Sequence, residues 1–228
     1  MQIGEPGARA QSRSEAAPAA LVALLVFVVL AVVSWLRDWS LIGLPWWIWL
    51  VIALPALLLA IDLSMTYRGR GLVRSRNAAL VLLGLLVLGN FVALALLVAG
   101  LVTASTSELT GGELLLTGFA IWAADVIVFG LWFWELEGGG PAARLLTPKR
   151  TTPEFQFPQD DNPQFAPEGW RPQVWDYVYV SLTNAIAFSP TDTMPLSLRA
   201  KAMMGLESGL SAVTVLLVAA RAVNILGS

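Results

Sequence analysis

The sequence predicts an all-α membrane protein with five transmembrane helices and one re-entrant half-helix before the last helix. Three observations predict this fold. The 228 residues are 57% hydrophobic and only 13% charged, whereas a soluble domain is about a quarter charged. Several apolar runs reach the roughly 20 residues that a helix needs to cross a hydrocarbon core of about 30 Å. Tryptophan, of which there are ten, gathers near the ends of these runs, as membrane interfaces favour.

Composition also excludes several classes of protein. The chain has no Cys and no His, which rules out disulfides, histidine metal sites and a Ser-His-Asp triad. No phosphate-binding loop, dinucleotide fingerprint or zinc motif is visible, so we expect neither an enzyme nor a cofactor. The net charge of −2 argues against nucleic acid as a partner, and the lipid bilayer is the partner that the composition indicates.

The N-terminal part is expected to form a tail and three spans. Residues 1–17 are rich in Gly, Pro, Ser and Arg without an apolar period, which predicts a disordered tail. A three-helix membrane region is predicted over 18–113, with spans at 19–35, 44–63 and 77–102. The first span continues into Ser34-Trp35-Leu36-Arg37-Asp38 without a small-residue cleavage site, so we interpret it as an uncleaved anchor rather than a signal peptide.

The C-terminal part, 114–228, is expected to form a separate unit. Its predicted segments are an outer helix 114–134, a connector 135–173, a half-helix 174–188, a turn 189–196 and an inner helix 198–226. The connector, which is rich in Gly and Pro, is predicted to be largely irregular. The half-helix covers only about 22 Å at 1.5 Å per residue, which is too short to cross the bilayer. We therefore expect it to enter the membrane partway and return to the side it came from.

The segment D-Y-V-Y-V-S-L-T-N-A-I-A-F-S-P-T-D-T-M-P-L, residues 176–196, resembles the pore helix and filter of potassium channels. Ser181, Thr183, Asp192 and Pro195 fall on matching positions of that pattern without a gap. The unit also resembles bacterial multi-pass membrane proteins that end in the same half-span, turn and helix. The resemblance implies a homotetramer that passes monovalent cations across a bacterial inner (plasma) membrane.

The chain departs from the potassium-channel pattern at the filter itself. Ser189-Pro190-Thr191 stands where the family has Gly-Tyr-Gly, and Pro locks φ while a β-branched Thr disfavours φ > 0. A dehydrated ring of carbonyls is therefore disfavoured, and we expect a hydrated path lined by side-chain oxygens. The candidate ion-pathway residues are Thr183, Asn184, Ser189, Pro190, Thr191 and Asp192. The alternative is an inert, capped turn in a non-conducting scaffold or partner subunit that retains the pore-loop fold.

Three ionisable residues fall inside predicted spans, where such groups are costly and often functional. They are Asp125, Glu207 and Arg221. Asp125 has two interpretations: a role in an ion or proton path or in gating, or a structural pairing with Asn90, Asn184 or Arg221. A proton-coupled carrier that uses Asp125 is a third possible function, ranked last because no inverted repeat is visible.

Basic residues in the short loops predict the orientation of the chain. Four arginines lie in the loop 64–76 and none in the loop 103–113, which places the N-terminus and the connector in the cytoplasm. The potassium-channel resemblance implies the opposite for the half-helix, because the pore loops of that family enter from outside. Either the pore loop is inverted or one earlier segment does not cross the membrane, and we favour the orientation that the basic residues give.

Overall fold

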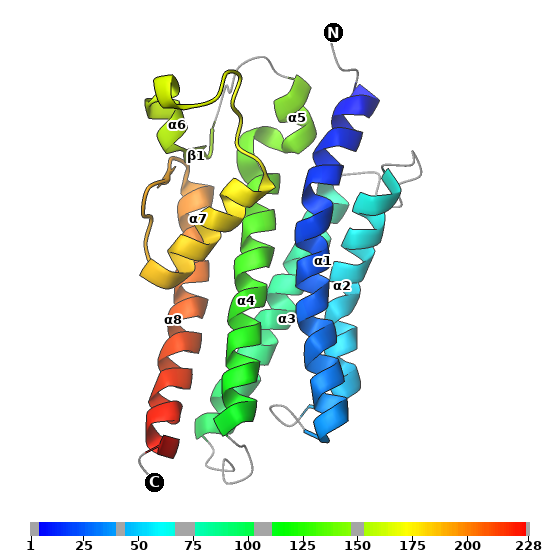
Figure 1. The fold of residues 1–228 in the computed structure, drawn as a ribbon, viewed down its shortest axis with the longest axis vertical. Helices are drawn as coiled ribbons and strands as arrows, with labels where there is room; N and C mark the ends of the chain where they lie inside the picture. Colours follow the sequence, from blue (N-terminus) through cyan, green and yellow to red (C-terminus); the bar gives the residue numbers. More distant parts are fainter. Residues whose placement is uncertain (1–4, 40–43, 67–75, 103–110, 147–152, 227–228) are drawn as a thin grey trace.

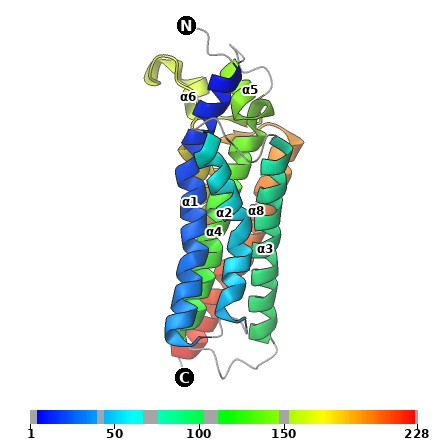
Figure 2. The same ribbon diagram turned by 90° about the vertical axis from the view of Figure 1, so that its right-hand side faces the viewer.

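The computed structural model describes residues 5–39, 44–66, 76–102, 111–146 and 153–226. Five long helices lie side by side and alternate in direction (Figures 1 and 2). They are α1 (Glu5–Arg37), α2 (Trp46–Thr66), α3 (Arg76–Val102), α4 (Gly111–Leu136) and α8 (Leu198–Leu226). The start of α1 and the segments between α4 and α8 lie at one end of this bundle, which we call the connector end. Helix α8 ends at the opposite end.

Four of these helices are long and apolar enough to cross a membrane. They are Ala16–Arg37, Asn77–Ala99, Gly112–Gly139 and Leu198–Ala220. Within the described side chains, α2 supplies a shorter apolar helix, Trp46–Ile61, so the fifth predicted span remains a prediction. On α3, Val81, Leu85, Leu88 and Val92 form an exposed apolar stripe at the spacing of one helix face. Such a face suits lipid, and the chain is a multi-pass integral membrane protein.

Small residues allow the helices to approach closely. The contact between α1 and α2 is extensive, and both helices carry alanines that are almost completely buried: Ala19, Ala20, Ala23, Ala53, Ala56 and Ala60. In lipid, helix association depends on such close packing more than on the hydrophobic effect. The alanine-rich seam thus fixes α1 against α2.

The connector is more ordered than its composition predicts. It contains the short elements η3 (Glu137–Gly139), α5 (Pro141–Leu146), β1 (Phe155–Gln156), α6 (Pro158–Asp161) and η4 (Pro163–Phe165). The helical run of α4 stops where Gly138, Gly139 and Gly140 take φ values of 54°, 82° and 105°, which glycine adopts without a steric penalty. Strand β1 pairs antiparallel with β2 (Met194–Pro195), inside the segment predicted as the turn 189–196.

Helix α7 (Val174–Ala187) matches the predicted half-helix closely, since it ends one residue earlier. It runs obliquely from the connector end, and the chain after it climbs back to the connector end before α8 begins (Figure 1). The N-terminus differs from the prediction, because α1 begins at Glu5 and most of the predicted disordered tail 1–17 is helical. Its many alanines favour helix, and Pro6 is tolerated in a first turn.

Candidate functional site

A capped start fixes where α7 begins. The backbone N–H of Gln173 donates to Asp176 Oδ2 at 2.7 Å, which satisfies one of the donors that a helix N-terminus exposes. One face of α7 is buried against α4 and α8; it comprises Val174, Tyr177, Val178, Ser181, Asn184 and Ala185. This spacing of three or four residues is that of a single helix face. The opposite face, with Trp175, Tyr179 and Ile186, is exposed.

A polar cluster holds the end of α7 against α8. The Asn184 side chain donates to the Glu207 carboxylate at 2.6 Å and to Met204 O at 3.0 Å, and its own oxygen accepts from Ser208 at 3.0 Å. Ser181 Oγ lies within hydrogen-bond distance of Glu207 and, at 2.7 Å, of Val126 O on α4. Asn184, predicted to line an ion path, therefore points into the bundle and connects α7 to α8.

Asp125 is buried nearby on α4 and accepts a hydrogen bond of 2.9 Å from Asn90 on α3. The side chains of Asp125 and Asn90 are each 1% exposed. Of the partners weighed from the sequence, the structure thus brings Asn90 to this carboxylate. The side chain of Arg221, the third ionisable residue predicted within a span, lies outside the described residues.

The chain leaves α7 through an exposed polar turn. Phe188 closes the helix in the left-handed region, with φ 54°, a conformation that glycine usually supplies at a helix end and that is uncommon for a bulky residue. Ser189, Pro190, Thr191 and Asp192 are all exposed. The hydroxyl of Thr191 donates to Asp192 Oδ1 at 3.1 Å. These four of the predicted ion-pathway residues therefore lie together on one exposed turn.

Thr183 belongs neither to the polar cluster of Asn184 and Glu207 nor to the exposed turn 189–192. Its hydroxyl donates to Val180 O within α7 at 3.1 Å, and the side chain is half-buried. A hydroxyl that bonds back to its own helix still offers lone pairs as acceptors. Thr183 therefore remains a candidate for the path, although it lies apart from the exposed turn.

The depth of the turn follows from the contacts of α7. Asn184 contacts the stretch of α8 from Met204 to Ser208, which lies about 9–15 Å from Leu198 at 1.5 Å per residue. The apolar segment of α8 that could cross a membrane begins at Leu198. The polar turn that follows α7 therefore lies well inside the length of that segment.

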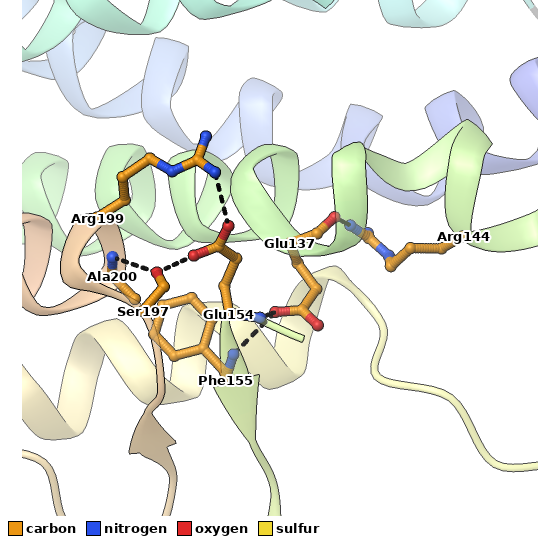
Figure 3. A network of polar contacts seen from close by, with 7 residues as sticks. All are labelled: Glu137, Arg144, Glu154, Phe155, Ser197, Arg199 and Ala200. Atoms are coloured by element: carbon orange, nitrogen blue, oxygen red, sulfur yellow. Dashed lines mark hydrogen bonds and ion pairs between the residues drawn. The ribbon is translucent and has the colours of Figure 1, made fainter. Parts of the chain in front are cut away.

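A second polar network, which the sequence did not reveal, supports the turn from the connector side (Figure 3). The buried Glu137 carboxylate accepts from the backbone N–H groups of Glu154 and Phe155, both at 3.0 Å. The Glu154 carboxylate accepts from the Ser197 hydroxyl and forms an ion pair of 3.6 Å with Arg199. Ser197 in turn accepts from Ala200 N–H at 3.1 Å, as a helix N-cap does. The network thus links the end of α4, β1 and the start of α8.

Arg144 extends this network toward α7. Its guanidinium donates to Trp134 O at 2.7 Å and to Glu137 O at 2.6 Å. It also lies over the Trp134 and Tyr177 rings at 5.6 Å from each centroid, within cation–π range. The one hint in the sequence is an acidic residue, Glu137, directly before three glycines. Its partners at 154 and 155 are 17 and 18 residues away, so no local pattern predicts them.

Comparisons with protein families, with curated proteins and with solved structures give no match to this chain. The fold itself defines a multi-pass integral membrane protein in which a short helix, α7, ends in an exposed polar turn. Among the described residues, no group of three or more acidic side chains is placed to hold a metal ion.

Proposed function

We propose that this chain is one subunit of a homotetrameric channel-like protein that passes monovalent cations through a bacterial inner membrane. In this proposal α1, α2, α3, α4 and α8 cross the bilayer, and α7 is a re-entrant half-helix like that of potassium channels. One observation carries the proposal: the exposed turn Ser189–Asp192 lies within the length of the apolar α8 segment.

Lipid does not tolerate irregular, polar backbone at this depth. Such backbone occurs in membranes only where protein covers it or where it lines a water-filled cavity. In a single chain the turn and the outer face of α7 are exposed, so further copies of the chain are needed to cover them. One half-helix and one inner helix cannot enclose a pore, and the number of four copies comes from the potassium-channel resemblance.

The chemistry of the turn favours a hydrated cation. Ser189 and Thr191 offer hydroxyl oxygens and Asp192 a carboxylate, and all three side chains are exposed. Repeated around a symmetry axis, the carboxylate would form an acidic ring, which is one known way to select cations. Within the described turn only Phe188 has a positive φ among the non-glycine residues, which supports a path lined by side chains rather than by a stack of carbonyls.

The direction of the helices places the N-terminal end of α1 on the same side as the connector. Both lie at one end of the bundle, as the four crossings α1 to α4 between them require. Because the arginine-rich loop and the connector are assigned to the cytoplasm, the half-helix enters from the cytoplasmic side, opposite to the potassium-channel arrangement.

This orientation is directly testable, because the chain has no native Cys. A single cysteine in place of Asp161, which is exposed on α6, should resist a membrane-impermeant thiol reagent in intact cells. The same variant should react in inside-out vesicles. Labelling of intact cells would reverse the orientation.

Ion flux from liposomes tests conduction. Purified protein should release K⁺ or Na⁺ down a gradient, and Asp192→Asn should lower the rate severalfold because it removes the negative charge that concentrates cations. Asp161→Asn, which removes an equally exposed carboxylate outside the turn, is the matched control and should leave the rate unchanged. Absence of flux from an intact oligomer would favour the non-conducting scaffold. The Pro190 that disfavours a carbonyl filter is the observation in favour of that alternative.

A further inference from the structure

Two carboxylates, Asp125 and Glu207, are buried beside α7. Asp125 and Glu207 are 1% and 0% exposed, and Ser181 lies within hydrogen-bond distance of both Glu207 and the carbonyl oxygen of Val126, the residue next to Asp125. Among the side chains that the structure describes, no basic group forms an ion pair with either carboxylate. Two unpaired negative charges at this depth of a membrane are costly and repel each other. The cluster therefore favours a state in which a proton removes one charge.

The hydrogen bonds indicate which carboxylate carries that proton. Ser181 has one hydroxyl proton but lies within hydrogen-bond distance of two acceptors, Val126 O at 2.7 Å and the Glu207 carboxylate. The other Glu207 oxygen already accepts from Asn184 at 2.6 Å. Both bonds of Ser181 form together only if Ser181 donates to Val126 O and accepts from a protonated Glu207.

We propose that Glu207 is a proton-binding site whose proton holds the half-helix α7 against α8, and that α7 loosens when this proton leaves. The groups facing Glu207 are Asp125 from α4, Asn90 beside it on α3, and Ser181 and Asn184 from α7. Of these only Asp125 can ionise. Loss of the proton would put a second charge beside Asp125 and would force Ser181 to choose between its two acceptors. The proposal concerns α7 itself and does not depend on conduction.

Infrared spectroscopy of the full chain in phospholipid nanodiscs tests where the proton is. At neutral pH we expect a protonated-carboxyl C=O band that is lost in Glu207→Gln, which keeps the shape and a donor toward Ser181. The control Glu168→Gln, exposed on the connector, should retain the band. In Ser181→Ala the band should persist but shift in frequency, because the carboxyl loses its partner. The Ser181 variant gives an answer even where Glu207→Gln does not fold.

Hydrogen exchange tests the consequence for α7. From neutral to alkaline pH, the protection factors of α7 amides should fall about tenfold in the wild type. The reason is that Glu207 without its proton becomes a second buried, uncompensated negative charge beside Asp125. Protection factors already correct for the pH dependence of intrinsic exchange. In Glu207→Gln they should stay constant with pH.

Three results would overturn the proposal. They are the absence of the band in the wild type at neutral pH, a band that survives Glu207→Gln, and protection of α7 that does not change with pH. Because none of these measurements needs ion flux, a scaffold that conducts nothing can still confirm the proton site.

Discussion

Replacing Gly130 by Ala should separate α7 from α4. A Cβ at Gly130 would lie 2.7 Å from Val178 Cα and 3.1 Å from Val178 N. Both neighbouring atoms belong to the backbone of α7, so no side-chain rotation can relieve the overlap. Ordinary contact begins near 3.4 Å, and α7 would therefore have to move by about 0.7 Å, the difference between these distances.

The consequences of this shift can be estimated. Ser181 lies one turn further along α7 and reaches Val126 O on α4 at 2.7 Å, so a shift of this size would stretch that bond toward the limit of hydrogen bonding. Overpacking costs about 1–3 kcal/mol and the weakened bond about 1 kcal/mol. The better helix propensity of Ala returns about 0.5–1 kcal/mol. We expect a net loss of about 1–3 kcal/mol in the free energy of unfolding.

Titration with SDS in mixed micelles, followed by tryptophan fluorescence, measures this change. The matched control is Gly112→Ala in the same helix, where a Cβ meets nothing within 4 Å. Because the substitution at position 112 changes only the helix propensity of that residue, Gly112→Ala should be neutral or should raise the free energy of unfolding by up to about 1 kcal/mol. If Gly130→Ala proved as stable as its control, the close approach of α4 and α7 would be refuted.

Three further predictions concern the polar contacts of Asn90 and Glu137 and the open space beside Gly209 on α8. Asn90→Ala removes the amide that donates to Asp125 and should lower the unfolding free energy by about 1–3 kcal/mol in the same titration; unchanged stability would mean that Asp125 has another partner. Glu137→Ala removes the carboxylate that accepts from the backbone N–H groups of Glu154 and Phe155. Mass spectrometry should therefore show faster hydrogen exchange at 154–155 than in the wild type and an unchanged rate in α1; unchanged protection at 154–155 would contradict this anchoring. Gly209→Leu fills a position that is open in one chain, and native mass spectrometry should show smaller oligomers, whereas an intact tetramer would exclude this face from the subunit interface.

The short helix α7 was predictable from the sequence because its signal is local. Its length, its polar turn and the long apolar run after it are all visible as composition, and α7 starts at the predicted Val174. The Trp-rich boundaries and the apolar runs similarly indicated the long helices. The N-terminal tail was misjudged because residues 5–17 lack an apolar period, whereas in the structure they continue the helix of the first span.

The direction of Asn184 was harder to predict, although a signal was present. Asn184 and Ser181 share the stripe of Val174, Tyr177 and Val178 at helical spacing, which is the face that packs against the bundle. The potassium-channel resemblance drew attention to polar residue types and so assigned Asn184 to an ion path. Helical phase, applied to the same residues, would have placed it on the buried face.

The glycines show why packing partners do not follow from sequence patterns. Gly205 and Gly209 have the G-x-x-x-G spacing that often marks close helix packing, yet a Cβ at either meets nothing within 4 Å in this chain. Gly118 and Gly130 have no such spacing, but they are where α4 meets Val218 and Val178. A glycine pattern shows that a backbone can be approached, but the fold decides which helix approaches it. Among the described residues nothing fills the space beside Gly205 and Gly209 on α8, so a neighbouring subunit of the proposed tetramer can pack there.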